Sequence, residues 1–386
     1  MRNQWNPGNP FPWYQEMLAS HPVWRDEEGS VHVFGYDNVS TVLSDYHRFS
    51  SNFGGDDDLH HPISQSLIAT DPPRHRALRA LVSQGFTPKT ITKLRPRIQE
   101  IASELVDAMA EPSSDIIAAL AYPLPVIVIA ELLGVPAEDR EQFKRWSDAM
   151  VSGVREAEQS QSVQAGAAQV ADPQREMAQY FLEMIEWRRK HPGQDLISDL
   201  LRATLEGEHL TSGELLGFCV LLLVAGNETT TNLIGNAVDT LMDHPEAFHQ
   251  GPHAPEEWGP LIEEVLRFRS PVQSMYRICR VPTQLGGVEL APKDPLVAWI
   301  GAANHDPSQF KDPEEFLPNR APNRHIAFGH GVHFCLGAPL ARLEASIGLA
   351  TLYTRFPNLV RANGDPPRPV PSSIVYGKEW LPASLR

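Results

Sequence analysis

One stretch of the sequence is apolar for longer than any other, and it constrains the possible folds most strongly. Residues Leu215–Ala225 are apolar except for Gly217. The preceding Thr211–Glu214 has the spacing of a helix capping box, with a hydroxyl and a carboxylate three residues apart. The apolar run is too short to span a bilayer, which takes about 20 residues. We therefore expect a helix that continues to about Met242 and is buried on all sides.

The rest of the chain has mainly helical periodicity, with apolar residues at three-to-four spacing. Short alternating segments predict strands near the N-terminus and within 271–301. Further predicted helices cover 37–43, 75–84, 88–109, 116–133, 175–191, 260–268 and 337–356, and predicted strands lie within 23–36, 284–290 and 296–300. Residues 50–70 are expected to form a long loop, and residues 155–172 a mobile connection. The sequence therefore predicts a mainly α protein with small β-sheets.

Charge and cysteine content argue against several classes of protein. The chain has 33 basic and 48 acidic residues and a net charge of −15, which disfavours binding to nucleic acid. The N-terminus lacks the apolar segment of a signal peptide or anchor, so we expect no membrane association and a cytoplasmic location. The three cysteines, Cys219, Cys279 and Cys335, lie far apart in sequence. Neither a disulfide framework nor a zinc site is predicted.

Cys335 lies in a loop of unusual composition. The segment Phe328–Gly337 has glycines on both sides of the cysteine and directly precedes a predicted helix. A helix N-terminus stabilises a thiolate through its dipole and free N–H groups, and glycines let backbone N–H groups approach the sulfur. A thiolate held in this way suits an axial position on haem iron. The alternative, from the loop alone, is a buried structural cysteine.

The spacing of the aromatic, glycine and cysteine residues in this loop matches a longer motif. Phe-x-x-Gly-x-x-x-Cys-x-Gly, at Phe328, Gly331, Cys335 and Gly337, resembles the haem-binding signature of cytochromes P-450. The resemblance implies a triangular helical prism around a buried haem b, with Cys335 as the proximal ligand to the iron.

The resemblance covers the chain from about residue 23 to the C-terminus and is weakest in 50–66 and 145–175. It implies one cytochrome P-450 domain over residues 1–386. Its expected parts are a β-rich portion over about 20–70, a helical core over about 71–270 and the haem-ligand loop over 328–337.

Three charged residues match the family outside the cysteine loop. Glu264 and Arg267 lie three apart on one helical face, and Arg320 follows in a Pro- and Asn-rich meander. By resemblance they form a buried ionic triad that fixes the meander before the cysteine loop. The alternative is an ordinary surface ion pair, which contributes little.

Four residues match the family's partners for the two haem propionates. His75 and Arg79 are four apart and share a helical face, which suits a pair of carboxylates. By resemblance Arg277 and His333 complete the set, the alternative being solvated surface residues. The remaining residues expected to contact haem are Ala225, Gly226, Phe328 and Gly337.

The apolar helix is interrupted by an acid and three hydroxyls in Gly226–Thr231. Burying such groups unpaired costs several kcal/mol, about 2–7 for each. Thr229 can bond back to the carbonyl of Ala225, which suggests a locally opened helix. By resemblance Glu228 and Thr229 form an acid–alcohol pair that delivers protons to O2 at the haem. The alternative is that these residues satisfy one another in a core.

The resemblance predicts a monooxygenase that inserts one atom of O2 into an apolar small molecule by hydroxylation or epoxidation. Its electrons would come from a separate ferredoxin or flavodoxin with a reductase, because the sequence has no pattern for a flavin or iron–sulfur domain. A haem-thiolate enzyme that catalyses coupling, desaturation or peroxide-driven oxidation is the alternative. A haem sensor or carrier is a third hypothesis, and the Glu228–Thr229 pair argues against it.

Two surfaces follow from these expectations. The substrate pocket should be lined by residues within 50–68, 145–175, 222–226, 272–275 and 373–375, and Asn227 is expected to face the substrate. Arg74, Arg76 and Arg342 are expected to form a basic patch for the electron donor, although charged helix faces are usually only solvated.

Overall fold

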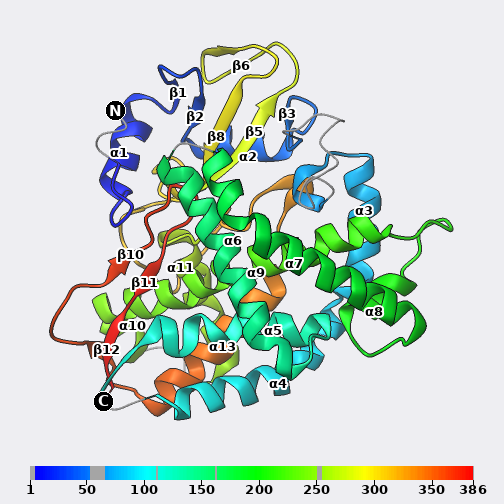
Figure 1. The fold of residues 1–386 in the computed structure, drawn as a ribbon. Coiled ribbons are helices and arrows are strands. Elements are labelled where there is room, and N and C mark those ends of the chain that lie inside the picture. Colours follow the sequence, from blue (N-terminus) through cyan, green and yellow to red (C-terminus); the bar gives the residue numbers. More distant parts are fainter. Residues whose placement is uncertain (1–4, 53–65, 110–111, 161–162, 250–253, 386) are drawn as a thin grey trace. The chain divides into compact units, whose positions relative to one another are not determined.

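The computed structural model describes residues 5–52, 66–109, 112–160, 163–249 and 254–385 (Figure 1). The chain forms two units, which are described in turn. Unit 1 contains residues 1–53, 99–121 and 229–386, and unit 2 contains residues 54–98 and 122–228. The prediction of a single domain over 1–386 stays a prediction.

Helices dominate both units. The α-helices are α1 (Phe11–Ser20), α2 (Tyr36–Ser44), α3 (Arg74–Gly85), α4 (Pro88–Asp107), α5 (Pro123–Leu133), α6 (Arg140–Ser160), α7 (Val163–Lys190), α8 (Leu196–Arg202), α9 (Ser212–Asp243), α10 (Pro245–His249), α11 (Gly259–Phe268), α12 (Ile300–Ala303) and α13 (Ala338–Arg355). The strands are β1 (Val23–Arg25), β2 (Val31–Val33), β3 (Phe49–Ser50), β4 (Ser113–Asp115), β5 (Ser274–Cys279), β6 (Thr283–Leu285), β7 (Val288–Leu290), β8 (Pro295–Trp299), β9 (Val360–Arg361), β10 (Arg368–Pro369), β11 (Lys378–Trp380) and β12 (Pro382–Ser384).

Unit 1 is built on a five-stranded sheet in the order β1-β2-β8-β5-β3 (Figure 1). The predicted N-terminal hairpin is confirmed as β1 and β2, which pair antiparallel. Strand β2 pairs in parallel with β8, which sets Val31 beside Leu296 and Val33 beside Ala298. All four side chains are fully buried. The two predicted strand regions, far apart in sequence, therefore form one sheet.

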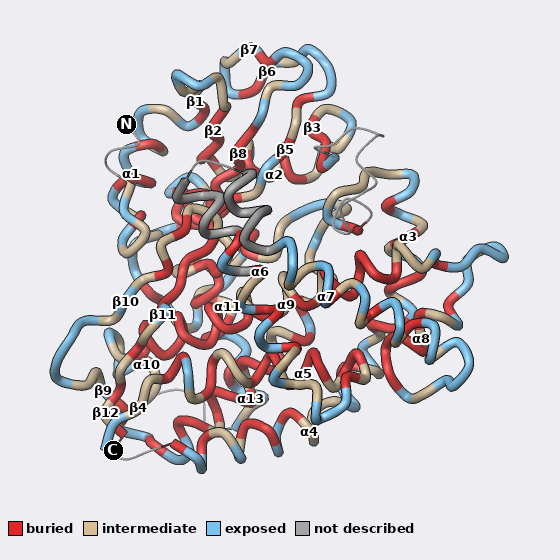
Figure 2. Tube along the Cα trace, viewed as in Figure 1, coloured by how far each residue is buried: buried red, intermediate tan, exposed pale blue. Residues whose placement is uncertain are grey.

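The long C-terminal helix of unit 1 is the predicted helix 337–356, found as α13. It begins with Pro339 in its first turn, where a proline costs no hydrogen bond. Most of its length is buried, including Leu343, Ile347 and Leu352 (Figure 2). The end of the Cys335 loop is thus fixed to a helix that is itself held by the core.

Unit 2 packs helices directly against helices. An added Cβ on Gly85, at the end of α3, would lie 2.5 Å from Leu196 of α8, so the two helices meet where only glycine fits. Helix α5 is almost entirely buried and ends at Gly134, whose φ of 80° lies in the left-handed region. These contacts hold α3, which carries His75 and Arg79.

The expected mobile connection over 155–172 is wrong. Helix α6 continues to Ser160 and α7 begins at Val163, so helices cover this region except for residues 161–162, which lie outside the described part of the chain. The segment is rich in Ala and Gln, which favour helix even where hydrophobic periodicity is weak. Pro173 lies inside α7 and does not end it. Most of the predicted 50–70 loop, residues 53–65, also lies outside the described residues.

Helix α9 confirms the predicted long apolar helix and its start, but the expectation that it is buried on all sides is wrong, because Ala225 is exposed. Thr211 accepts a hydrogen bond from the Glu214 amide, and Glu214 accepts one in return from the Thr211 amide. Its length and apolar composition satisfy the criteria for a membrane span, with a mean hydropathy of 1.2, but 61% of that window is buried inside the protein. Core helices meet the same criteria, so this is weak support for a membrane span.

One carboxyl in the unit 1 core is predicted to make stability depend on pH. Glu344 on α13 is 2% exposed, and burial raises its pKa to about 8. The unfolded chain loses this proton near pH 4, at the ordinary pKa of about 4.3. The folded chain keeps the proton up to about pH 8. The free energy of unfolding should therefore fall as pH rises between these values and level off above them.

Glu344→Gln removes this penalty. We expect the variant to be more stable than the unsubstituted protein at pH 8, by on the order of 3 kcal/mol, and the difference to shrink toward pH 5. Unfolding measured at both pH values checks this. Glu289→Gln, which changes an exposed carboxylate on β7, serves as the control. A gain for Glu344→Gln that is equal at both pH values would show that Glu344 does not titrate in this way.

Candidate active site

The Cys335 loop has the tight geometry that its glycines predict. Gly329 and Gly331 have φ values of 75° and 72°, in the left-handed region that favours glycine. A Cβ on Gly331 would lie 2.7 Å from the backbone of Ser44, so any side chain there would collide with α2. The Cys335 amide donates to the Phe328 carbonyl at 2.9 Å, which closes the loop immediately before α13.

The accessibility of the three thiols separates Cys335 from the others. Cys219 and Cys279 are buried, whereas Cys335 is partly exposed. Burial raises the pKa of both buried thiols, and Cys279 donates a hydrogen bond to the Val281 carbonyl at 3.1 Å. These two cysteines fit the structural role. The residues around Cys335 fit a haem iron ligand, since an accessible thiol beside a helix N-terminus is readily deprotonated.

The flank of the cysteine loop is held by charged groups. The Arg342 guanidinium lies 4.5 Å from the centre of the Phe328 ring and pairs with Glu263 at 2.6 Å. Burial alone would raise the pKa of Glu263, but hydrogen bonds from Arg342 and His325 outweigh it and hold the pKa at about 2. The carboxylate therefore stays charged and keeps Arg342 in place.

The expected basic patch is largely neutralised. Arg342 is committed to Glu263, and Arg74 is hydrogen-bonded to Glu214 in unit 2. A cation already paired with a carboxylate contributes little net field at a distance. Arg74 and Arg342 therefore do not provide the positive patch that was expected for the electron donor. The sequence did not reveal this because their acidic partners lie far away in sequence.

Unit 1 contains two of the expected propionate partners. Arg277 lies on β5, is 3% exposed, and donates to the Tyr276 carbonyl at 2.7 Å. His333 lies in a short 3₁₀ turn, with its Nε2 atom 3.1 Å from the Ser51 hydroxyl. The burial of Arg277 excludes the alternative that it is a solvated surface residue.

Unit 2 contains the other two, on α3. His75 is 2% exposed, and Arg79, one turn later, is half-buried. Burial, followed by the charge of Arg79, lowers the pKa of His75 to about 4. His75 is thus a neutral imidazole at physiological pH and can donate a single N–H hydrogen bond, while Arg79 supplies the positive charge. The solvated-surface alternative is wrong for His75.

The turn of α9 that carries the expected acid–alcohol pair has an accessible face. Leu222, Ala225, Gly226 and Thr229 share one side of the helix, and all four are at least partly exposed. Glu228, on the adjoining stripe, is also partly exposed. Helix α9 runs without interruption from Ser212 to Asp243, so the expected local opening is absent from these residues.

Gly226 has a packing role that the sequence did not reveal. A Cβ at this position would lie 2.7 Å from the Ile129 side chain of α5. A side chain at Gly226 would therefore require the end of the Ile129 side chain to shift within unit 2. The expectation that Gly226 contacts haem is untouched by this finding.

The expectation that Asn227 faces the substrate is wrong. Asn227 is 1% exposed and donates from its side-chain amide to the Ser147 hydroxyl of α6 at 2.7 Å. Ser147 is itself fully buried. Leu223, Asn227 and Thr230 lie on one buried face of α9, but the sequence does not single out this face because the helix is apolar on most sides.

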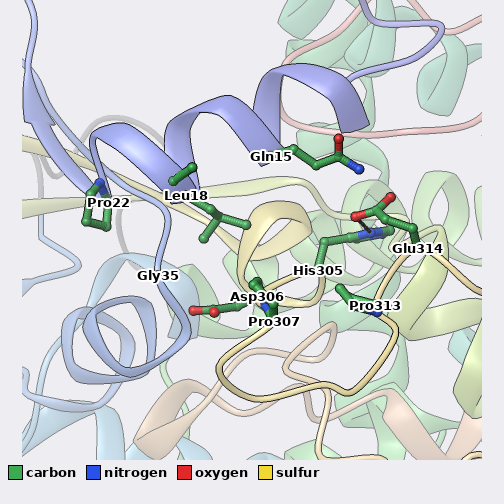
Figure 3. A pocket seen from close by; sticks show the side chains of 10 residues that line it. Gln15, Leu18, Pro22, Gly35, His305, Asp306, Pro307, Pro313 and Glu314 are labelled. Carbon is green, nitrogen blue, oxygen red and sulfur yellow. Dashed lines mark hydrogen bonds and ion pairs between the residues drawn. The ribbon is translucent and has the colours of Figure 1, made fainter.

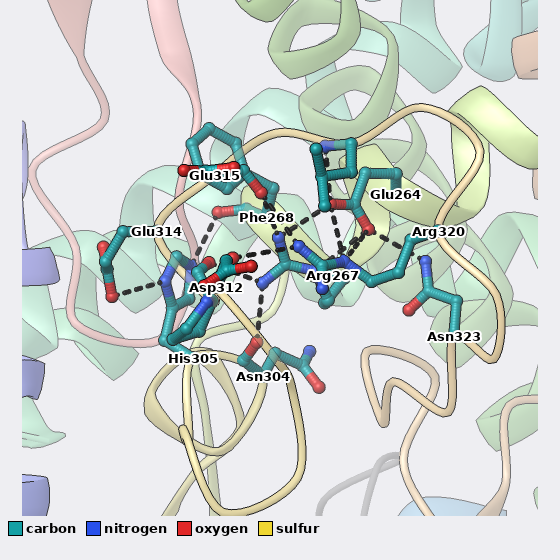
Figure 4. A network of polar contacts seen from close by, with 12 residues as sticks. Glu264, Arg267, Phe268, Asn304, His305, Asp312, Glu314, Glu315, Arg320 and Asn323 are labelled. Atoms are coloured by element: carbon teal, nitrogen blue, oxygen red, sulfur yellow. Dashed lines mark hydrogen bonds and ion pairs between the residues drawn. The ribbon is translucent and has the colours of Figure 1, made fainter.

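The predicted ionic triad is confirmed in unit 1 (Figure 4). Glu264 and Arg267 are fully buried and joined by hydrogen bonds of 2.7 and 2.9 Å. Arg320 reaches the same carboxylate at 3.0 and 3.1 Å. The Leu317 amide and the Asn323 side chain each donate to Glu264 at 3.0 Å. One carboxylate therefore organises the meander that precedes the cysteine loop.

A cavity of about 250 Å³ lies elsewhere in unit 1, between α1 and the segment after α12 (Figure 3). It is lined by Gln15, Leu18, Ala19, Pro22, Gly35, His305, Asp306, Pro307, Pro313 and Glu314. His305 and Glu314 pair with each other at 3.3 Å. None of the lining residues belongs to the expected active site.

Comparison with known proteins decides the family. The family model described as Cytochrome P450 matches residues 12–250 and 260–379. The chain is a cytochrome P450. The putative cytochrome P450 YjiB of Bacillus subtilis is 42% identical to it over 379 residues, 97% of this chain and 94% of that protein. Erythromycin C-12 hydroxylase of Saccharopolyspora erythraea is 40% identical over 373 residues, 96% of this chain and 93% of that protein.

Crystal structures confirm the fold of this cytochrome P450. Substrate-free CYP109E1 from Bacillus megaterium matches with a TM-score of 0.92 and 42% identity, covering 99% of this chain and 100% of that one. The same enzyme in complex with testosterone matches with a TM-score of 0.88 and 42% identity, covering 98% and 99%. The predicted mainly α fold with small sheets is therefore the cytochrome P450 fold.

Membership of the family establishes the cofactor and the general reaction. Cytochromes P450 bind haem b and use O2 in monooxygenation, and relatives of this chain are named monooxygenases and hydroxylases. This cytochrome P450 is accordingly a haem monooxygenase, an oxidoreductase that uses O2.

Proposed function

We propose that Cys335 is the thiolate ligand to the haem iron of this cytochrome P450. The observation that carries the proposal is the accessibility of Cys335 in its glycine-rich loop before α13, while Cys219 and Cys279 are buried. A thiolate ligand increases electron density at the iron and favours cleavage of the O–O bond. Phe328 and Gly337, on either side of the cysteine, complete the contacts of this loop with the cofactor.

The propionates are assigned to His75, Arg79, Arg277 and His333. Two of these side chains are guanidinium groups, which suit carboxylates. The other two are imidazoles that can donate N–H hydrogen bonds. On α9, Ala225 and Gly226 lie on the accessible face and are assigned to further contacts with the cofactor.

Glu228 and Thr229 are assigned to proton delivery. Both are partly exposed on the turn of α9 that also presents Ala225. The Thr229 hydroxyl can donate one proton and accept another, and the Glu228 carboxylate can replace it. This function requires no local opening of the helix.

The substrate is an apolar small molecule with some oxygen function. Leu222 and Ala225 offer apolar surface on the accessible face of α9, which suits such a guest. CYP109E1 binds testosterone in the structure compared above, and a second relative hydroxylates erythromycin. A steroid is therefore the first probe for this enzyme.

Electrons come from a separate ferredoxin or flavodoxin with its reductase, in the cytoplasm. Three cysteines are too few to hold an iron–sulfur cluster, which takes four, in addition to ligating haem iron, and this supports a separate donor.

The test is turnover of testosterone under ¹⁸O2 with NADPH, a ferredoxin and its reductase. We expect a product that carries one ¹⁸O atom and forms only when the electron donor is present. A parallel reaction supplies hydrogen peroxide without the donor. Equal product from peroxide alone, with no incorporation from ¹⁸O2, would favour peroxide-driven oxidation and overturn the O2-dependent proposal.

A further inference from the structure

The C-terminal half of α9 carries a buried polar face in unit 1. Asn232, Asn236 and Asp239 follow at spacings of four and three residues, so they share one side of the helix. They are 2%, 0% and 3% exposed. Thr229 lies on the same side, seven residues before Asn236, which is about 10 Å along the helix axis. The polar face that begins at Thr229 therefore continues into the core through the side chains of Asn232, Asn236 and Asp239.

Asn236 joins two chain segments that are far apart in sequence. Its side-chain amide donates to the carbonyl of Arg269 and to that of Tyr376, both at 3.0 Å. Arg269 lies three residues before the 272–275 segment begins, and Tyr376 directly follows the 373–375 segment. Both segments are expected to line the substrate pocket. The buried Asn236 side chain therefore holds the start of the first segment and the end of the second.

The two segments are also hydrogen-bonded to each other. The Tyr376 amide donates to the Pro271 carbonyl at 2.9 Å, and the Gln273 amide donates to the Ile374 carbonyl at 2.7 Å. The Ser274 hydroxyl donates to the Ser373 carbonyl at 3.1 Å. The two segments form one short two-stranded ribbon. We therefore expect a shift at the end nearest Asn236 to move the whole ribbon.

Ion pairs on the same face hold both strands of the ribbon at the end nearest Asn236. Asp239 is bonded to Arg269 at 2.8 Å and lies 3.2 Å from the Lys378 ammonium. A Cβ on Gly377 would lie 2.0 Å from the Asn232 side-chain oxygen, so the chain approaches α9 where only glycine fits.

We propose that Asn236 is a positioning residue for specificity. Its two hydrogen bonds fix where the two-stranded ribbon of residues 271–276 and 372–377 lies along the axis of α9 relative to Thr229. That position determines which carbon of the substrate is oxidised. The proposal rests on the assignment of this ribbon to the pocket wall under the proposed function. Asn236 itself contacts neither substrate nor cofactor. Its effect reaches the pocket only through the two backbone carbonyls.

The test compares Asn236→Leu, which has nearly the same volume but no N–H donors, with Thr240→Val. Thr240 is equally buried one turn later, and its hydroxyl donates to the Asn236 carbonyl of its own helix. Thr240→Val therefore controls for the loss of a buried hydrogen bond in α9. Gly377→Ala is a second variant, which pushes the ribbon away from Asn232 without changing α9.

Two readouts are taken on the haem-loaded enzyme. Amide hydrogen exchange in peptides over 271–276 and 372–377 should rise at least tenfold in Asn236→Leu and Gly377→Ala but not in Thr240→Val. The ratio of testosterone product isomers should change at least threefold in the same two variants, with a larger change in kcat than in KM for the main product.

The outcomes separate this inference from the proposed function. Unchanged exchange in both Asn236→Leu and Gly377→Ala overturns the positioning role, whatever the substrate. Raised exchange with an unchanged isomer ratio also overturns it, because the ribbon then has no influence on specificity. If the unsubstituted enzyme neither binds nor oxidises steroids, the steroid assignment fails, while the exchange experiment still decides whether Asn236 positions the ribbon.

Discussion

Replacing Glu264 with Gln is expected to lower the free energy of unfolding by about 3–5 kcal/mol, because breaking a buried ion pair leaves an uncompensated charge. Glu264 is fully buried and accepts hydrogen bonds from Arg267, Arg320, Leu317 and Asn323. The variant would leave two guanidinium groups in the core without a carboxylate. Total stabilities are typically about 5–15 kcal/mol, so much of the protein would fail to fold or to retain haem.

Glu263→Gln is the matched control for this prediction. Its carboxylate is one residue away and also pairs with an arginine, but Arg342 and Glu263 are 36% and 31% exposed. The control should cost less, on the order of 1–2 kcal/mol, because solvent screens a pair that is about one-third exposed. Urea unfolding and the fraction of haem-loaded protein measure both variants. If Glu264→Gln were no less stable than Glu263→Gln, the triad would not organise the meander.

Thr229→Ala is expected to uncouple the reaction. Without the hydroxyl, the donor should continue to be oxidised and peroxide released, while product per donor falls roughly 10–100-fold, since a positioned proton donor contributes about 10²–10⁴-fold and water replaces part of it. Donor consumption, peroxide and product are measured in the same reaction.

Thr229→Ser is the control, because it keeps the hydroxyl and removes only a methyl group. We expect it to retain most of the coupling. The assignment of Thr229 to proton delivery is contradicted if the Ala variant remains as well coupled as the unsubstituted enzyme. A parallel loss of product in both variants would instead indicate that the methyl group and its packing matter.

The residues that the sequence predicted correctly belong to motifs in which several residues occur at fixed spacing. The Cys335 loop combines glycines at fixed spacing with a following helix, and its backbone adopts the left-handed angles that those glycines allow. Glu264 and Arg267 were predictable as a pair from helical spacing. Their burial and the arrival of Arg320 followed from the family resemblance.

The residues that were predicted wrongly depend on contacts that are distant in sequence. In a helix that is apolar on most sides, periodicity does not show which neighbour each face contacts, so Asn227 was assigned to the substrate side although it bonds to Ser147 of α6. Arg74 and Arg342 looked like free cations because Glu214 and Glu263 lie far from them in sequence. The parallel pairing of β2 with β8 has no local signal for the same reason.

The central claim is that Cys335 supplies the thiolate that binds haem iron. The most direct test is the optical spectrum of the reduced, carbon monoxide-bound protein, recorded for the unsubstituted enzyme, Cys335→Ser and Cys279→Ser. We expect a strongly red-shifted Soret band in the unsubstituted enzyme and in Cys279→Ser, whose thiol is buried, and its loss in Cys335→Ser. An unshifted band in the unsubstituted enzyme, or a red-shifted band that survives in Cys335→Ser, would contradict the assignment.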